Sequence, residues 1–382
     1  MSTITEAQVR TALAAVEDPE VRRPITEIGM VKSITISDSD DIAVEIYLTI
    51  AGCPMKSTLI ERTDEALKGI DGVGQTTVTT DVMNDEQRRQ FREAVRGSAE
   101  PVVPFAQADS TTRVFAVASG KGGVGKSSVT VNLAAALAKK GLAVGVLDAD
   151  VYGHSVPHMM GSTEKPHQVD DMIMPPQSHG VSLISIGHFI DDNAPVVWRG
   201  PMLHRAIQQF LVDVFWGDLD VLLFDLPPGT GDIAISVAQL VPNAELLIVT
   251  TPQQAAAEVA ERAGTISLQT RQRIFGVIEN MSWMEMPDGS RMEVFGEGGG
   301  EAVSKRLTRL TGAEVPLLGQ VPLDVQLREC GDTGTPIAIE NPDSPAGKAL
   351  NEIAGKLQIR RESLAGKSLN LGVAQKGDNL MG

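Results

Sequence analysis

The chain is poor in cysteine, in aromatic residues, in long apolar runs and in basic side chains. Two cysteines among 382 residues offer no disulfide framework and fit a reducing compartment. Because 33 Lys and Arg face 49 Asp and Glu, the net charge is −16, which disfavours nucleic acid as the main partner. The apolar runs are far shorter than a membrane span, and the N-terminus shows no signal-peptide pattern. We therefore expect a cytoplasmic protein that binds neither nucleic acid nor membrane.

A glycine-rich segment at residues 120–127, GKGGVGKS, carries most of the functional information. It follows an apolar run at 114–118 and precedes a helical pattern, which is the context of a Walker A phosphate-binding loop. Backbone N–H groups of such a loop surround phosphate oxygens, and the helix N-terminus adds partial positive charge. We predict that Lys126 contacts the β and γ phosphates of ATP and that Ser127 binds Mg²⁺. The predicted nucleotide-contacting residues of the loop are Gly120, Lys121, Gly122, Gly123, Val124, Gly125, Lys126, Ser127 and Ser128.

Carboxylates follow two further apolar runs. Residues 142–147 form a buried-strand pattern that ends at Asp148 and Asp150, and residues 221–224 form another that ends at Asp225. Parallel α/β sheets place ligand chemistry at the carboxyl ends of their strands, and a single carboxylate there is the Walker B form that holds a water on Mg²⁺. The same alternation continues with a strand at 246–249, a helix at 254–268, a strand at 274–278 and a helix after 296–300. We predict an α/β fold with a doubly wound, mostly parallel sheet.

A second lysine, Lys121, directly follows the first glycine, where an ordinary Walker A loop does not need one. This placement resembles the deviant Walker ATPases, which include MinD, ParA, the nitrogenase iron protein and the Mrp/ApbC iron–sulfur carriers. The resemblance implies that Lys121 crosses a homodimer interface to the partner's nucleotide; the alternative is a solvated loop lysine. It also implies that Asp150 orients the attacking water, that Asp148 lies near the magnesium ion and that residues 226–232 form a switch loop.

Three segments narrow the resemblance to the Mrp/ApbC branch, namely WRGPM at 198–202, DLPPGTGD at 225–232 and ENMS at 279–282. By this resemblance Asn280 and Pro322 contact adenine. The resemblance covers nearly the whole chain. It implies a dimeric ATP hydrolase with slow basal turnover that carries iron–sulfur clusters to apoproteins or works with assembly factors.

The composition predicts four parts of the chain. Residues 1–97 form a small α/β domain, 98–112 a Pro- and Ala-rich linker, 113–359 the ATPase domain and 360–382 a disordered tail. In the first part, apolar residues alternate between 42 and 48 and predict a half-buried strand. The segments DPE at 18–20, IGMV at 28–31 and GCP at 52–54 resemble the small domain of iron–sulfur assembly factors.

The cysteines depart from the pattern of the resemblance. Mrp-type proteins typically carry Cys-x-x-Cys soon after the ENMS segment, and two such pairs hold a shared [4Fe–4S] cluster between two chains. Here Met286 and Gly289 stand at these positions, and neither can replace a thiolate as an ordinary cluster ligand. The usual cluster site is absent. A nucleotide-gated scaffold or switch that carries no cluster is therefore the alternative function.

Cys53 lies between a strand and a helical pattern that starts near Lys56. A thiol at a helix N-terminus has a lowered pKa, so we expect either a reactive or iron–sulfur-binding thiolate or a small buried apolar side chain. We expect Cys330 to lie at a helix end without a role. His154 and His158 have helical spacing, but Pro157 argues against a regular helix, so we expect a solvated or nucleotide-adjacent pair rather than a metal site.

Overall fold

The computed structural model describes residues 4–50, 52–53, 55–96, 103–151, 153–169, 172–189, 200–229, 231–253 and 256–357. The predicted tail at 360–382 lies outside the described residues, as do residues 98–102 of the predicted linker. Residues 198 and 199 of the WRGPM segment and residue 230 of the predicted switch loop also lie outside them. No helix within the described part of the chain is long and apolar enough to cross a membrane.

The N-terminal part is a small α/β unit. Its elements are α1 (Glu6–Leu13), β1 (Val31–Ile36), β2 (Ile42–Leu48), α2 (Lys56–Lys68), β3 (Thr76–Val82) and α3 (Asp85–Arg96). The strand order is β1-β2-β3, antiparallel between β1 and β2 and parallel between β2 and β3. Along β2 the buried residues alternate with more exposed ones, which confirms the strand predicted from the sequence. Helix α1 begins at a capping box in which Thr5 and Gln8 exchange hydrogen bonds.

The larger part is built on an eight-stranded sheet of order β15-β12-β11-β4-β10-β5-β9-β8. Every neighbouring pair in it is parallel except β8 with β9. Its strands are β4 (Arg113–Ser119), β5 (Val144–Asp148), β8 (Gln177–Ser178), β9 (Val181–Ser185), β10 (Val221–Asp225), β11 (Glu245–Thr250), β12 (Ile274–Asn280) and β15 (Leu317–Val321). Two antiparallel hairpins lie outside it, formed by β6 (His167–Val169) with β7 (Met172–Met174) and by β13 (Met284–Glu285) with β14 (Arg291–Met292).

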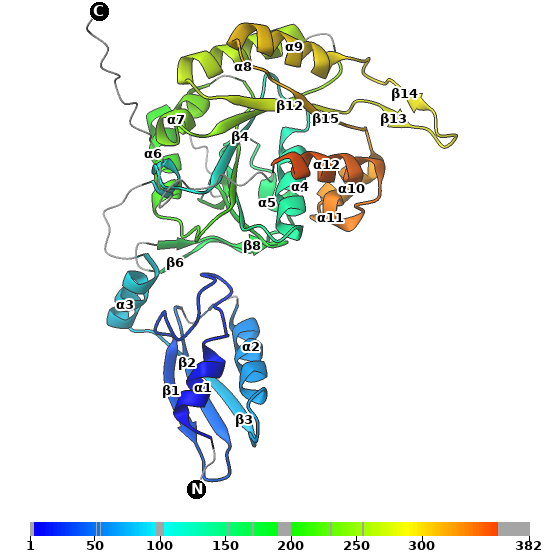
Figure 1. The fold of residues 1–382 in the computed structure, drawn as a ribbon. Helices are drawn as coiled ribbons and strands as arrows, with labels where there is room; N and C mark the ends of the chain where they lie inside the picture. Colours follow the sequence, from blue (N-terminus) through cyan, green and yellow to red (C-terminus); the bar gives the residue numbers. More distant parts are fainter. Residues whose placement is uncertain are drawn as a thin grey trace, which may run out of the picture.

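Helices cover both faces of this sheet (Figure 1). Alternate residues of each strand enter different cores: Val114 and Ala116 of β4 face one, and Phe115 and Val117 face the other. The first core is closed by α6 (Gly200–Val212), α7 (Asp232–Leu240), α8 (Ala256–Thr270) and α9 (Gly299–Thr311). The second is closed by α4 (Lys126–Lys139), α5 (Val156–Met159), α10 (Val325–Thr333), α11 (Ile337–Glu340) and α12 (Pro345–Leu357). The predicted doubly wound, mostly parallel α/β fold is confirmed.

The N-terminal unit lies beside the β6–β7 hairpin of the larger part (Figure 1). Val169, Met172 and Met174 of this hairpin are buried in the same apolar cluster as Ile28 and Leu48 of the N-terminal unit. The small core is therefore completed by side chains from the larger part of the chain.

Candidate functional site

The loop between β4 and α4 has the backbone that a phosphate-binding loop requires. Gly123 and Gly125 both have φ of +77°, in the left-handed region that side chains other than glycine rarely adopt. A Cβ on Gly125 would also lie 2.2 Å from the Nδ2 atom of Asn280. Because Gly125 immediately precedes α4, the loop ends at a helix N-terminus, where free N–H groups and the helix dipole favour an anion.

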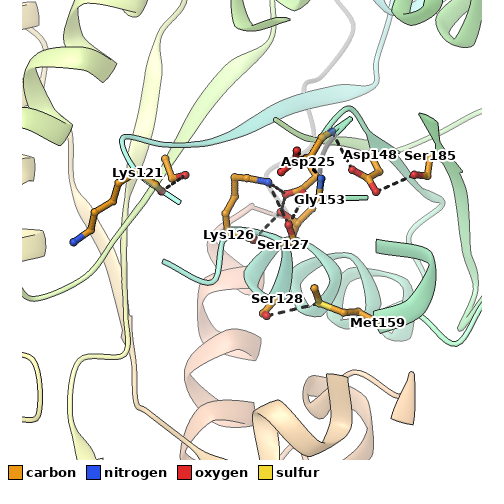
Figure 2. Close-up of polar contacts among 12 residues, drawn as sticks. Lys121, Lys126, Ser127, Ser128, Asp148, Gly153, Met159, Ser185 and Asp225 are labelled. Atoms are coloured by element: carbon orange, nitrogen blue, oxygen red, sulfur yellow. Dashed lines mark hydrogen bonds and ion pairs between the residues drawn. The ribbon is translucent and has the colours of Figure 1, made fainter. Parts of the chain in front are cut away.

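Lys126, Ser127 and Asp225 converge beneath this loop (Figure 2). The Lys126 ammonium lies 2.6 Å from Asp225 Oδ1, and the Ser127 hydroxyl donates to Asp225 Oδ2 at 2.5 Å. Lys126 is 6% exposed and Asp225 is fully buried, so each charge depends on the other for compensation. The arrangement brings a cation, a hydroxyl and a carboxylate together, as binding of a phosphate with Mg²⁺ requires.

Asp148 lies next to Asp225 because their strands pair in register, and Ser185 pairs with Asp148 on its other side. The Ser185 hydroxyl donates to Asp148 Oδ2 at 3.0 Å, and the backbone N–H of Asp150 donates to Asp148 Oδ1 at 3.1 Å. Burial, and then the neighbouring Asp225 charge, raise the pKa of Asp148 to about 7. Asp150 accepts from the Gly153 N–H at 3.1 Å and lines the cavity over the loop. Two predicted carboxylates thus stand at the strand ends beside the loop.

A separate cavity of about 420 Å³ opens beside α4 and is lined by Asn280 and Pro322, together with Met281, Leu323 and Leu327. The Asn280 Nδ2 atom donates to the Val124 carbonyl at 2.9 Å, which fixes the orientation of the amide. Its Oδ1 atom is buried, and no group among the described residues donates a hydrogen bond to it. A buried acceptor of this kind is costly unless a ligand donates to it, so the cavity suits a flat base that carries an amino group.

Lys121 lies apart from this cluster. Its side chain extends away from Lys126 and Ser127 (Figure 2), and its Nζ atom donates to Gln253 Oε1 at 2.5 Å. The Ser119 hydroxyl donates to the Lys121 carbonyl at 3.0 Å and holds the start of the loop. Within a single chain, Lys121 is therefore directed away from the phosphate-binding groups.

Cys53 is placed as predicted, three residues before α2, but the expected lowering of its pKa is wrong. Burial, followed by the charges of Glu20, Asp18 and Glu164, raises the pKa of the Cys53 thiol to about 12. One backbone N–H, that of Met55, acts in the opposite direction and is outweighed. This arrangement therefore favours the thiol over the thiolate.

The segment where the resemblance places a cysteine pair is the β13–β14 hairpin. Met286 accepts from the N–H of Gly289 at 2.9 Å in the turn, and Gly289 has φ of +80°. Cys330 lies within α10, and both cysteines are free. Among the described residues, no three His, Cys, Asp or Glu side chains are grouped so as to hold a metal ion. His158 belongs to the single-turn helix α5 and lines the base cavity, whereas His154 precedes that helix.

Sequence reasoning missed two residues that support the carboxylates. The Thr130 hydroxyl lies 2.8 Å from Asp225 Oδ1, and Ser185 bonds to Asp148. The helical spacing of four residues between Lys126 and Thr130 could have revealed the first. No local pattern reveals the second, because Ser185 reaches Asp148 through the pairing of β5 with β9.

Comparisons with known proteins agree with this geometry. Residues 110–358 match the model of the NUBPL iron-transfer P-loop NTPase family, and residues 6–80 match that of the iron-sulfur cluster assembly protein family. The chain is 64% identical, over 96% of both chains, to the iron-sulfur cluster carrier protein of Mycobacterium tuberculosis strain H37Rv. It is 38% identical to the protein of the same name from Bacillus subtilis, over 94% of this chain and 98% of that one. A nucleotide-binding protein from Archaeoglobus fulgidus, solved in complex with ADP, is similar in structure, with a TM-score of 0.53, 36% identity and coverage of 64% and 94%.

Proposed function

Because the chain belongs to the NUBPL iron-transfer P-loop NTPase family, we propose that it binds and hydrolyses ATP with Mg²⁺ and delivers iron–sulfur clusters to apoproteins. The observation that carries the nucleotide part is the convergence of Lys126, Ser127 and Asp225 under the glycine loop. The family of the chain, and the name of a relative that is 64% identical to it, support iron–sulfur clusters as the cargo. This retains the interpretation made from the sequence motifs.

The phosphates of ATP bind at the N-terminus of α4. Backbone N–H groups of residues 120–125 surround them, and Lys126 exchanges its partner Asp225 for the β and γ phosphates. Mg²⁺, when bound, neutralises charge that develops on the phosphates. Ser127 and Asp225 would hold the ion, and Asp148, bonded to Ser185, lies next to Asp225. Asp150, at the edge of the same cavity, orients the attacking water.

The base occupies the cavity between Asn280 and Pro322. Adenine can donate a hydrogen bond from its amino group to the Asn280 Oδ1 atom. Guanine has a carbonyl oxygen at the same position, and two acceptors facing each other repel. The amide cannot rotate freely to accommodate guanine, because Nδ2 already donates to the Val124 carbonyl. The site therefore selects ATP over GTP.

Hydrolysis requires two copies of the chain. Lys121 is directed away from the phosphate-binding groups of its own chain, and its placement in the motif resembles that of the lysine that reaches the partner's nucleotide in deviant Walker ATPases. In the dimer Lys121 leaves Gln253 and adds a positive charge to the nucleotide of the second copy. ATP binding and association of the two chains are thereby coupled.

The cargo binds differently from the pattern of the Mrp/ApbC resemblance, because the hairpin bears Met286 and Gly289 rather than a cysteine pair. Cluster carriage then depends on Cys53 or on groups supplied by a client. This same hairpin favours a second candidate function, a nucleotide-gated dimeric switch that carries no cluster itself.

Anaerobic reconstitution of the full chain with iron and sulfide, with and without Mg-ATP, separates the two. Iron and acid-labile sulfide near about one cluster per dimer, retained in Cys330→Ser and lost in Cys53→Ser, support carriage by this chain. Transfer is then measured as the gain of activity of an apo-ferredoxin or apo-aconitase. No specific iron in a protein that still hydrolyses ATP overturns carriage and leaves the switch.

A further inference from the structure

Part of the wall of the base cavity is made by two helices, α5 and α10, which are in contact with each other (Figure 1). Both contribute side chains to the lining, His158 and Met159 from α5 and Leu327 and Arg328 from α10. The helices come from parts of the chain that are far apart in sequence. The distance between them therefore helps to set the space that the cavity offers to a base.

Helix α10 is held only weakly by apolar burial. None of its nine residues is buried, and Val325 is 58% exposed. Leu327 and Cys330 are partly buried against the core beneath the helix. Packing of an apolar face is what usually fixes a helix on its sheet, and segments with few buried apolar contacts have low local stability. The position of α10 therefore depends on how its two ends are held.

The C-terminal end of α10 meets the turn after α5 at two glycines. Gly334 ends α10 with φ of +77°, and Gly161 follows α5 with φ of +61°. A Cβ on Gly161 would lie 2.8 Å from the Gly334 carbonyl oxygen, and a Cβ on Gly334 would lie 2.7 Å from the Gly161 nitrogen. Both distances are shorter than van der Waals contact, and both neighbours are backbone atoms that cannot turn aside. The two segments approach this closely because neither residue has a side chain.

Two consecutive residues where β8 turns into β9 hold both sides of this approach. The Nε2 atom of His179 donates to the Gly334 carbonyl at 3.0 Å. The hydroxyl of Ser178 donates to the carbonyl of Met160, the residue directly before Gly161. Because these donors are neighbours in the chain, one turn ties the end of α5 to the end of α10.

We propose that Gly161, Ser178, His179 and Gly334, which we call the clasp, are positioning residues for the base of the nucleotide. None of the four lines the base cavity or the cavity over the phosphate-binding loop, so they act through α5 and α10. The clasp holds α10 close to α5 and keeps the cavity at the width of a base, so that binding does not first have to order these helices. The inference rests on the proposed binding of ATP and adds residues that determine how well the base fits.

Gly334→Ala tests the clasp in the full chain, because a Cβ forces the end of α10 away from Gly161. We expect the Kd values of ATP and ADP, measured by calorimetry, to rise by the same factor of about tenfold, since the cavity no longer fits the base. Inorganic tripolyphosphate, which has no base, should keep the parent's inhibition constant against a methylanthraniloyl-labelled ATP. Gly312→Ala is the matched control, since Gly312 ends α9 with φ of +70° and no described atom lies within 4 Å of a Cβ there. It adds a similar backbone strain without a clash and should bind ATP like the parent.

His179 supplies a milder test that leaves both glycines in place. His179→Ala removes the hydrogen bond to the Gly334 carbonyl and should raise the Kd of ATP by about threefold, whereas His179→Gln retains a donor and should restore the parent value. His204→Ala, on α6 at the other face of the sheet, should have no effect. Parent-like ATP binding in His179→Ala, or an equal loss of affinity for ATP and tripolyphosphate, would overturn the clasp alone. A parent protein that does not bind ATP would overturn the proposed function and this inference with it.

Discussion

The phosphate-binding edge and the surroundings of Cys53, which include Asp18 and Glu20, both bury ionisable groups, but the edge places a cation in direct contact with a buried carboxylate. At the edge, the buried Asp225 carboxylate has the Lys126 ammonium at 2.6 Å. Near Cys53, buried Asp18 lies close to Glu20, and the Arg62 charge, which lowers the pKa of Asp18, has less effect than burial, which raises it. Burial with the Glu20 charge raises the pKa of Asp18 to about 6 and that of the Cys53 thiol to about 12.

This difference indicates what each region is prepared to do. A paired cation can leave its carboxylate for an incoming phosphate, so the edge is ready for an anionic ligand as it stands. Around Cys53, burial and the nearby acids outweigh the one backbone N–H that lowers the thiol pKa, so the thiolate forms only when these surroundings change. The phosphate-binding groups are therefore already in place in this structure, whereas chemistry at the Cys53 thiol requires a change in its surroundings.

The largest expected effect concerns Lys126, the cation that compensates the charge of Asp225 at the phosphate-binding edge. Lys126→Ala should reduce ATP hydrolysis by on the order of 10²-fold or more, since it removes the charge that stabilises the phosphates in the transition state. Phosphate release measured at saturating Mg-ATP checks this. Lys305→Ala removes an exposed lysine paired with Glu301 on α9 and should hydrolyse ATP at the parent rate. Parent-like turnover in Lys126→Ala would show that the loop does not do this chemistry.

A smaller effect is expected at the base. Asn280→Ala removes both the free acceptor and the hydrogen bond to the Val124 carbonyl, and it should weaken ATP binding by about tenfold. Discrimination between ATP and GTP should shrink as well, because the unpaired oxygen that disfavours guanine is gone. Competition of the two nucleotides against a fluorescent ATP analogue measures both. Retention of full discrimination would place the base elsewhere.

The residues of the phosphate-binding edge could be predicted from the sequence, whereas the direction of the Cys53 pKa shift could not, and the reason is physical. Gly125 and Lys126 act through local geometry, since a strand, a glycine turn and a helix position them within one supersecondary unit. Asp225 reaches them because β10 pairs with β4, and its place at the end of an apolar run marks it in the sequence. The pKa of Cys53 is raised by burial and by charges distant in sequence: Glu20 meets it through the fold of the N-terminal unit, and Glu164 comes from the larger part of the chain. A helix N-terminus alone suggested the opposite direction. Ser185 was missed for a similar reason, because only the sheet register brings it to Asp148.

The third prediction separates the acids around the thiol from burial itself. Glu20→Gln keeps the size of the side chain and removes a charge that raises the thiol pKa, so alkylation of Cys53 should become about threefold faster at constant pH. The rate is measured in the Cys330→Ser background with N-ethylmaleimide. Glu27→Gln changes an exposed carboxylate paired with Arg23 in the same unit and serves as the control. A rate that Glu20→Gln leaves unaltered would mean that desolvation alone sets the thiol's reactivity.

The last prediction concerns stability rather than activity, and its sign follows from the raised pKa of Asp18. The ordinary pKa of this carboxyl is 3.8 and the folded value is about 6, so the folded chain binds the proton more tightly than the unfolded chain. The free energy of unfolding therefore falls, through this group, as pH rises from about 4 to about 6, and the full cost is present at higher pH. Asp18→Asn retains an oxygen that can accept from the N–H groups of Glu20 and Val21 but carries no charge. It should match the parent near pH 4 and be more stable near pH 7, by on the order of 2 kcal/mol. Urea unfolding of both proteins at the two pH values gives the difference directly. If the two curves run parallel across this window, Asp18 is ionised in the folded chain at no cost, and the contrast between the surroundings of Cys53 and the phosphate-binding edge is lost.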